Sequence, residues 1–203
     1  MTCVPKHLLT RPLFCNPACC LISTNADGTP NAMTVSWLTP LDNHTLFLLS
    51  LNAGRHTLSN LLAEGRSAFT LCPWVEGMEP LALACGGSSG AAHLGLGGKL
   101  AGLGVALCAP GGGAAGGGGC GPPALRDCPV HIACRVRGRM GLAGEDGAAE
   151  GGDALRGHVA LLCSVEAAWV AAGYWGEGKL CRAGPGLPRL LSFLGSRVFA
   201  PIG

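Results

Sequence analysis

The chain has 203 residues, of which 48% are hydrophobic, and only 13% are charged, about half the usual charged share of roughly 25%. Such low charge excludes an intrinsically disordered chain, and the formal net charge of +2 gives no reason to expect a nucleic acid as a partner. The 34 glycines follow no three-residue period, which excludes collagen. We expect a single domain over residues 1–203.

Short strands and turn signals alternate in the first third of the chain. Residues 18–24 form an apolar run, and residues 25–30 contain an Asp-Gly turn signal. In residues 31–38 the apolar side chains alternate with the hydroxyls of Thr34 and Ser36. This alternation predicts a strand that carries both hydroxyls on one face.

The rest of the chain continues the same pattern. Residues 45–51 predict another strand, and residues 55–64 predict a helix because three leucines follow the helical spacing i, i+3, i+4. Further strands are predicted at 66–72, 129–136 and 158–170. We interpret the tail, residues 187–199, as helical or irregular. Many short strands with few helices predict a mostly β fold, an antiparallel β-barrel with short helices.

Glycine is concentrated in two segments. Residues 86–123 contain 16 of the 34 glycines, and Lys99 is the only formally charged residue there. The stretch has too many glycines for a membrane-spanning helix. Residues 111–116 fit the pattern G-x-G-x-x-G, but glycine rather than a helix follows, so we predict no dinucleotide-binding loop. We interpret 86–123 and 141–153 as glycine-rich loop insertions.

The cysteines indicate a reducing compartment. There are 12 of them without any C-x-x-C pair, so we expect buried free thiols and no metal site. Residues 1–11 contain one proline and no apolar core of the length that a secretory leader needs. These observations favour a cytoplasmic protein that contacts no membrane.

A possible anion site begins at residue 55. Arg55 and His56 stand where the predicted helix starts, and main-chain N–H groups at a helix start attract anions such as phosphate. Thr57 adds a hydroxyl or caps the helix, and the strand 31–38 offers two more hydroxyls and the aromatic plane of Trp37. A second interpretation stays open, in which these residues are an ordinary strand, a capped helix and a core tryptophan.

Several segments, taken in order, resemble one known family. They are Asp-Gly-Thr-Pro-Asn-Ala-Met-Thr-Val-Ser-Trp at 27–37, Arg-His-Thr at 55–57, Phe-Thr-Leu-Cys-Pro at 69–73, the strand 128–136, Gly157-His158, Tyr174-Trp175 and the closing segment 191–201. This order is similar to that of the flavin reductase-like family, FMN-binding split barrels that include flavoredoxin. The resemblance covers most of the chain except the two glycine-rich insertions.

The resemblance implies a six-stranded antiparallel Greek-key split barrel that forms a homodimer, with FMN bound at the interface. It implies that the hydroxyls and the tryptophan of 31–37 lie along the flavin and that residues 55–57 hold its phosphate or ribityl groups. The cofactor-binding residues implied by the resemblance are Asn31, Met33, Thr34, Ser36, Trp37, Asn52, Arg55, His56, Thr57, Lys99, His158 and Phe193, with Phe199 as an alternative to Phe193.

Lys99 and His158 are the catalytic candidates, because a positive charge stabilises reduced anionic flavin. Two departures from the family pattern concern them. The segment 88–99 lacks the usual charged residues, and Gly157 precedes His158 where the family motif has aspartate. His158 is alternatively an ordinary half-buried strand histidine. We interpret His131 as structural and His44 as a turn residue.

Two functions fit these observations. The first is an oxidoreductase that transfers electrons from NAD(P)H to flavin, or from bound FMN to an acceptor such as a redox partner protein. The second is a non-catalytic, FMN-binding dimeric protein. Bound flavin that is reduced by a nicotinamide distinguishes the first function from the second.

Overall fold

The computed structural model describes residues 16–88, 99–112, 121–140, 157–177, 179–180, 184–195 and 197–202. Its centre is an antiparallel sheet whose strands are β1 (Cys19–Thr24), β2 (Pro30–Val35), β3 (Leu38–Pro40), β4 (Leu46–Asn52), β5 (Ala68–Pro73), β8 (Val130–Arg139) and β9 (His158–Val170). The predicted insertion 141–153 lies outside the described residues. The mostly β fold is confirmed.

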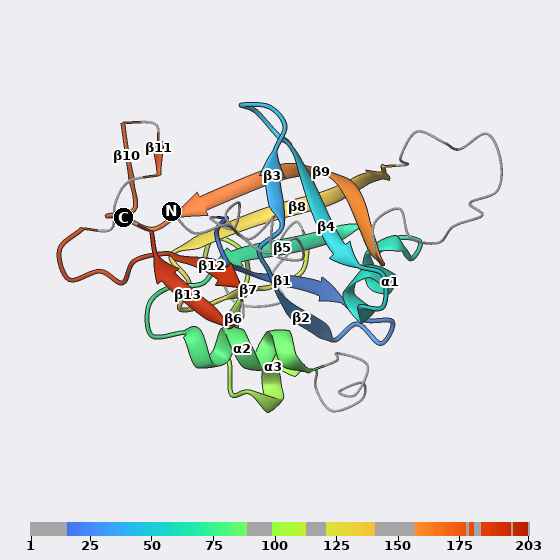
Figure 1. Ribbon diagram of the computed structural model, residues 1–203, viewed down its shortest axis with the longest axis horizontal. Helices are drawn as coiled ribbons and strands as arrows, with labels where there is room; N and C mark the ends of the chain where they lie inside the picture. The colour runs from blue at the N-terminus through green and yellow to red at the C-terminus, as the bar shows by residue number, and fades with distance from the viewer. Residues whose placement is uncertain are drawn as a thin grey trace, which may run out of the picture.

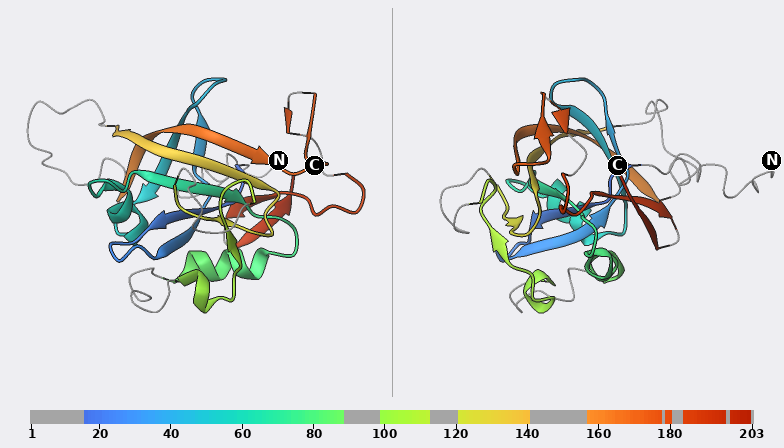
Figure 2. Two further views of the ribbon diagram at one scale, coloured as in Figure 1. Left: turned by 180° about the vertical axis from the view of Figure 1, so that it is seen from behind. Right: turned by 90° about the vertical axis from the view of Figure 1, so that its left-hand side faces the viewer.

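The order of the strands explains why the sheet curls into a split barrel (Figures 1 and 2). The order is β2-β1-β5-β8-β9-β4-β3, so the two edge strands, β2 and β3, are neighbours in the sequence. Only Ser36 and Trp37 separate them, and the main-chain N–H of Ser50 in β4 donates to the carbonyl of Trp37 over 3.0 Å. The predicted single strand 31–38 is therefore two strands, and the sheet has seven strands rather than the expected six.

The first four residues of strand β1 are apolar because both faces of the strand are buried there. Cys20 and Ile22 pack with the fully buried Trp74, whereas Cys19 and Leu21 face a second core cluster on the other side of the sheet. Successive side chains of a strand point to opposite faces, so a strand covered on both sides shows no polar alternation.

Three short helices accompany the sheet: α1 (His56–Leu62), α2 (Glu79–Gly87) and α3 (Lys99–Gly102). Helices α2 and α3 lie together beneath β2 in Figure 1. Leu100 of α3 and Ala82 and Cys85 of α2 are buried in the same core cluster as Trp74. The predicted loop 86–123 is thus partly helical, and it also contributes the two-residue strand β6 (Leu107–Cys108), which pairs with β7 (Ala124–Leu125).

The tail forms a β-hairpin, so the prediction of a helical or irregular segment at 187–199 is wrong. Strands β12 (Leu191–Gly195) and β13 (Val198–Pro201) pair antiparallel. Leu191 connects this hairpin to the barrel, because its carbonyl accepts from the N–H of Ala18 and its own N–H donates to the carbonyl of Trp74, each over 2.8 Å. A further small pair joins β10 (Trp175–Gly176) and β11 (Lys179–Leu180).

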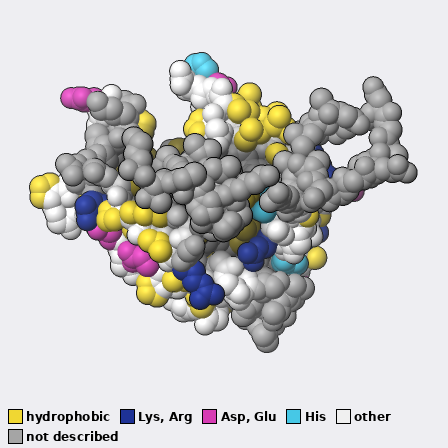
Figure 3. All heavy atoms as spheres, in the orientation of Figure 1, with side chains coloured by type: hydrophobic (Ala, Val, Ile, Leu, Met, Phe, Trp, Pro, Cys, Tyr) yellow, Lys and Arg dark blue, Asp and Glu magenta, His cyan; other side chains and the backbone are white. Residues whose placement is uncertain are grey.

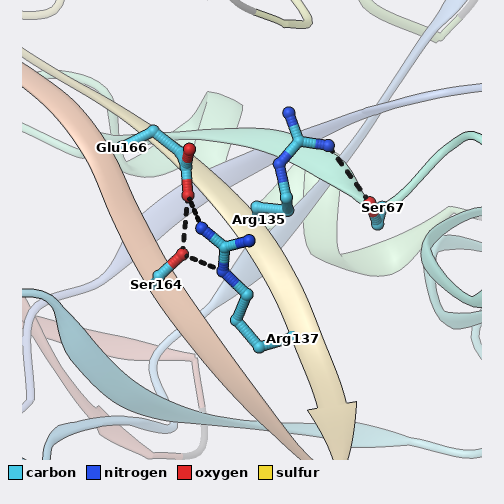
Figure 4. Close-up of polar contacts among 5 residues, drawn as sticks. All are labelled: Ser67, Arg135, Arg137, Ser164 and Glu166. Atoms are coloured by element: carbon cyan, nitrogen blue, oxygen red, sulfur yellow. Dashed lines mark hydrogen bonds and ion pairs between the residues drawn. The ribbon is translucent and has the colours of Figure 1, made fainter.

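Strands β8 and β9 are the longest in the sheet, and two shifts in their pairing register allow them to bend. Polar contacts on their exposed side hold them together (Figure 4). The guanidinium of Arg137 donates to Ser164 Oγ over 2.8 Å and to Glu166 over 2.5 Å, and Ser164 donates to the same carboxylate oxygen. Arg135 donates to Ser67 on the adjoining segment.

The thiols are buried as expected. All eight cysteines in the described part of the chain are buried and free of disulfides. Burial raises the pKa of the Cys163 thiol to about 12, so it stays protonated at neutral pH. Within the described ranges, no group of three or more metal-ligating side chains occurs. None of the described helices is long and apolar enough to cross a membrane.

Candidate functional site

A cavity of about 680 Å³ lies where the chain passes from β2 to β3. This volume falls in the range of roughly 300–1,000 Å³ that small-molecule sites occupy. The residues lining the cavity are Met33, Thr34, Val35, Ser36, Trp37, Ser50, Leu51, Asn52, Arg55, Ala82, Leu83, Gly86, Gly87, His158, Phe193, Arg197 and Phe199. They come from β2, β4, β9, the end of α2 and the C-terminal hairpin. The candidate site therefore lies at the opening of the barrel between the edge strands β2 and β3.

Aromatic rings provide much of the lining. Trp37 is 39% exposed, so the interpretation as a core tryptophan is wrong, and Trp74 has that place instead. The rings of Trp37 and His158 lie 4.5 Å apart between centroids with 33° between their planes. Phe193 and Phe199 face each other across the C-terminal hairpin at 5.4 Å. In the space-filling view, hydrophobic side chains also gather beside the β3–β4 hairpin (Figure 3).

His158 is held in the lining by strand pairing. It begins β9 opposite Asn52 at the end of β4, and both side chains line the cavity. No hydrogen bond from the His158 ring to another described residue is found. The ring therefore keeps both nitrogens for solvent or a ligand.

Arg55 connects two elements at the floor of the site. It precedes α1, and its Nη1 donates to the carbonyl of Gly86 at the end of α2 over 3.3 Å. A guanidinium has five N–H donors, so one such bond leaves most of them for a ligand. A cation here also stabilises the negative end of the α2 dipole.

Lys99 lies behind the cavity rather than in its lining. Its side chain is 1% exposed, and Nζ donates to the carbonyls of Ala32 over 3.0 Å, Ser88 over 2.7 Å and Cys85. These three bonds use all the donors of an ammonium group. Burial lowers the pKa of Lys99, and the nearby Cys85 thiol opposes that shift. Lys99 thus joins β2 to the C-terminal end of α2, where carbonyls lack helical partners.

Thr34 shares its hydroxyl between two neighbours. Its Oγ1 donates to the carbonyl of Ala82 over 2.5 Å and accepts from the indole Nε1 of Trp74 over 3.2 Å. The hydroxyl therefore connects β2 with α2 and with the residue that follows β5. Thr34 lines the cavity while its polar atom is already engaged.

Three predicted binding residues belong instead to a buried polar network beneath α1. Asn31 Nδ2 donates to Thr57 Oγ1 over 2.9 Å and to Ser23 Oγ over 3.1 Å. The Nε2 of His56 donates to Asn25 Oδ1 over 2.9 Å. These hydrogen bonds hold α1 against β1 and β2, while the buried Oδ1 of Asn31 has no hydrogen-bond partner among the described residues.

The structure brings together most of the residues selected from the sequence. Those that line the cavity are Met33, Thr34, Ser36, Trp37, Asn52, Arg55, His158 and Phe193, whereas Asn31, His56, Thr57 and Lys99 lie outside its lining. Sequence reasoning missed Ser50, the end of α2 and Arg197. The sequence Gly-Ser-Arg at 195–197 between two apolar runs was the signal for a hairpin that would have brought Arg197 to the site.

Comparison with known proteins identifies the family. The model for the flavin reductase like domain matches residues 14–184. The chain belongs to the flavin reductase-like family. A search of curated proteins finds no match.

Solved structures share the split-barrel fold of this family at low sequence identity. Flavoredoxin from Methanosarcina acetivorans aligns with a TM-score of 0.68 at 15% identity, covering 100% of this chain and 91% of that one. Nitrilotriacetate monooxygenase component B from Bacillus cereus gives 0.72 at 16% identity, covering 100% and 96%. An FMN-binding protein from Thermus thermophilus with bound 1-cyclohex-2-enone gives 0.66 at 16% identity, covering 99% and 92%.

The lining fits the flavin that binds to proteins of the flavin reductase-like family. A flavin mononucleotide combines a planar apolar ring, a chain of hydroxyls and a phosphate dianion. The rings of Trp37, Phe193 and Phe199 in the cavity suit the planar ring of the flavin. The side chains of Ser36 and Asn52 suit the chain of hydroxyls, and an arginine suits the phosphate. Among the described lining residues there is no carboxylate to repel the phosphate.

Proposed function

We propose that this protein binds FMN in the cavity at the β2–β3 link and works as an oxidoreductase. In this proposal electrons pass from NADH or NADPH to the flavin, or from bound FMN to an acceptor. The observation that carries the proposal is the combination of aromatic faces, hydroxyl and amide groups and an available arginine in one cavity of a flavin reductase-like chain. Bound FMN supplies the hydride and electron chemistry, for which these side chains have no redox group of their own.

The residues of this chain bind and orient the cofactor. Arg55 donates to the phosphate through the guanidinium N–H groups that Gly86 leaves unused. Asn52 and Ser36 donate to or accept from the hydroxyl chain, and Trp37 and Phe193 exclude water from the ring. His158 stands beside Trp37, where a protonated imidazole stabilises negative charge that develops on reduction.

Lys99 has a positioning role in this proposal. Its ammonium group fixes the C-terminal end of α2 against β2, and this end presents Gly86 to Arg55. Arg55 is near enough to Lys99 for its positive charge to help lower the pKa of the Lys99 ammonium group. An anion bound at Arg55 therefore experiences the field of two cations.

A homodimer is part of the proposal. The exposed Trp37 of the cavity lining and the exposed Leu41 and Leu46 of the β3–β4 hairpin give a second copy an apolar surface to cover. A second copy placed there would close the open side of the cavity over the flavin.

Arginine substitution tests the binding site. Replacing Arg55 with alanine removes charge-assisted hydrogen bonds to phosphate, which are worth about 1.5–3 kcal/mol, so the Kd for FMN should rise about tenfold to a hundredfold. Binding is measured by quenching of flavin fluorescence. Arg126→Ala is the matched control, because Arg126 is an exposed arginine that also donates to one main-chain carbonyl but lies outside the cavity. Equal affinity in both variants contradicts the assignment of Arg55.

A further inference from the structure

A second arginine enters the cavity from the C-terminal hairpin. Arg197 lies in the turn between β12 and β13, and it lines the cavity together with Phe193 and Phe199, which pair across the hairpin. Its backbone has φ of 67°. Helix α1, which follows Arg55, lies apart from this hairpin along the long axis of the molecule (Figure 1).

The backbone of Arg197 is unusual for its residue type. A φ near +60° brings the Cβ of an L-residue close to its own main chain, so such turn positions favour glycine, asparagine or aspartate. The short connection between β12 and β13 explains why the position has a positive φ, but it does not explain why the residue is arginine. Non-glycine residues with this backbone conformation cluster at active sites and ligand clamps, so the conformation suggests a role for the Arg197 side chain in binding.

Arg197 has no role in the proposed binding of FMN and no charged partner among the described residues near the cavity. Arg55 donates to the carbonyl of Gly86, whereas no hydrogen bond or ion pair joins Arg197 to any other residue in the described ranges. The described lining has these two arginines and no carboxylate. FMN carries one phosphate group, and Arg55 accounts for it in the proposed function.

We propose that Arg197 is a second anion subsite, which holds a phosphate of the nicotinamide dinucleotide while its nicotinamide reaches the flavin. This inference rests on the proposed function and names the residue that binds the second substrate. A guanidinium beside two aromatic rings suits a phosphate next to a planar base or ribose. Two phosphates qualify: the pyrophosphate, which NADH and NADPH share, and the phosphate monoester on the adenosine ribose, which only NADPH has.

Binding of the oxidised nucleotides tests the subsite without any turnover. NAD+ and NADP+ are titrated separately into the FMN-loaded protein and followed by calorimetry. Arg197→Gly should weaken binding of at least one nucleotide about tenfold to a hundredfold, as expected for loss of a charged hydrogen-bond donor to phosphate. Arg197→Lys keeps the charge and should retain most of the affinity. Equal weakening indicates the pyrophosphate, and weakening of NADP+ alone indicates the extra phosphate.

A loss of nucleotide affinity in Arg197→Gly should not come from a loss of folding. Glycine suits a φ of 67°, so Arg197→Gly should melt at the same temperature as the original protein or higher. Glu177→Gly is the matched control, because Glu177 is the other described non-glycine residue with positive φ, at 52°, and it does not line the cavity. Its nucleotide affinity should not change.

Three results overturn the subsite. They are unchanged affinity of Arg197→Gly for both nucleotides, a loss that falls on FMN instead of the nucleotides, and an original protein that binds FMN but neither nucleotide. A protein that binds no FMN overturns the proposed function together with the subsite. The failure of the subsite alone is therefore distinguishable from the failure of the proposed function.

Discussion

Thr34 shows how one hydroxyl can support both the fold and the cavity. The hydroxyl satisfies the buried indole N–H of Trp74 and the carbonyl of Ala82 at once. Removing one partner of a buried hydrogen bond leaves the other without compensation for its lost water. The side chain therefore matters through its oxygen rather than through its volume.

Valine at this position tests that role. Thr34→Val keeps the shape of the side chain and should lower the free energy of unfolding by about 1–3 kcal/mol, the usual effect of a buried polar group left unsatisfied. Urea denaturation measures this change. Thr39→Val, on the exposed side of β3, is the control and should change stability little. A Thr34→Val protein as stable as the control would show that the two hydrogen bonds contribute nothing.

Lys99 and Arg197 have contacts or positions that could not be predicted from the sequence. The partners of Lys99 are main-chain carbonyls, which every residue has, so no side-chain pattern reveals them. Arg197 reaches the cavity only because a hairpin places it there. Trp37, by contrast, was identifiable from the motif at 27–37 that resembles the flavin reductase-like family.

At the scale of elements, an ion pair between Arg189 and Glu76 holds the segment before the C-terminal hairpin against the segment that follows β5. The Arg189 guanidinium donates to both carboxylate oxygens of Glu76 over 2.7 and 3.0 Å, and the Arg189 main-chain N–H donates to the same group over 2.8 Å. These contacts hold the pKa of Glu76 below its usual value. Both side chains are partly exposed, so their contribution to stability is small and screened by salt.

This pair predicts the direction of a pH effect. A carboxyl whose pKa is lower in the folded than in the unfolded state stabilises the fold above its unfolded pKa, and that stability is lost as the pH falls through its folded pKa. At neutral pH, Glu76→Gln should melt below the original protein, and the difference should shrink as the pH falls below the usual glutamate range. Glu64→Gln, at an exposed turn, is the control. A difference that grows in acid contradicts the prediction.

Elements differed in how well their sequences predicted them. Strands β4 and β9 have clear apolar runs bounded by turns, and both were predicted to within a few residues. Helix α2 was missed because its apolar residues run directly into the glycine-rich stretch, which obscures their spacing. The link at Ser36 was missed because strand alternation continues across it, although pairing with β1 ends at Val35 and pairing with β4 begins at Leu38.

At the scale of the whole molecule, the closure of the barrel creates the site. The two edge strands of the sheet are neighbours in the sequence, and the residues between them line the cavity. The C-terminal hairpin and the end of α2 complete the lining. The sequence could predict the strands and the family, but the exact lining depends on how distant segments meet.

Reduction of the flavin by a nicotinamide tests the proposed oxidoreductase function. The purified protein is loaded with FMN, freed of oxygen and mixed rapidly with NADH or with NADPH while the visible flavin absorption is followed. We expect the bound flavin to bleach with at least one of the two nucleotides, and we expect less bleaching in Arg55→Ala because that variant retains less FMN. Bound FMN that only dithionite reduces would contradict the proposed oxidoreductase and favour a non-catalytic FMN-binding protein.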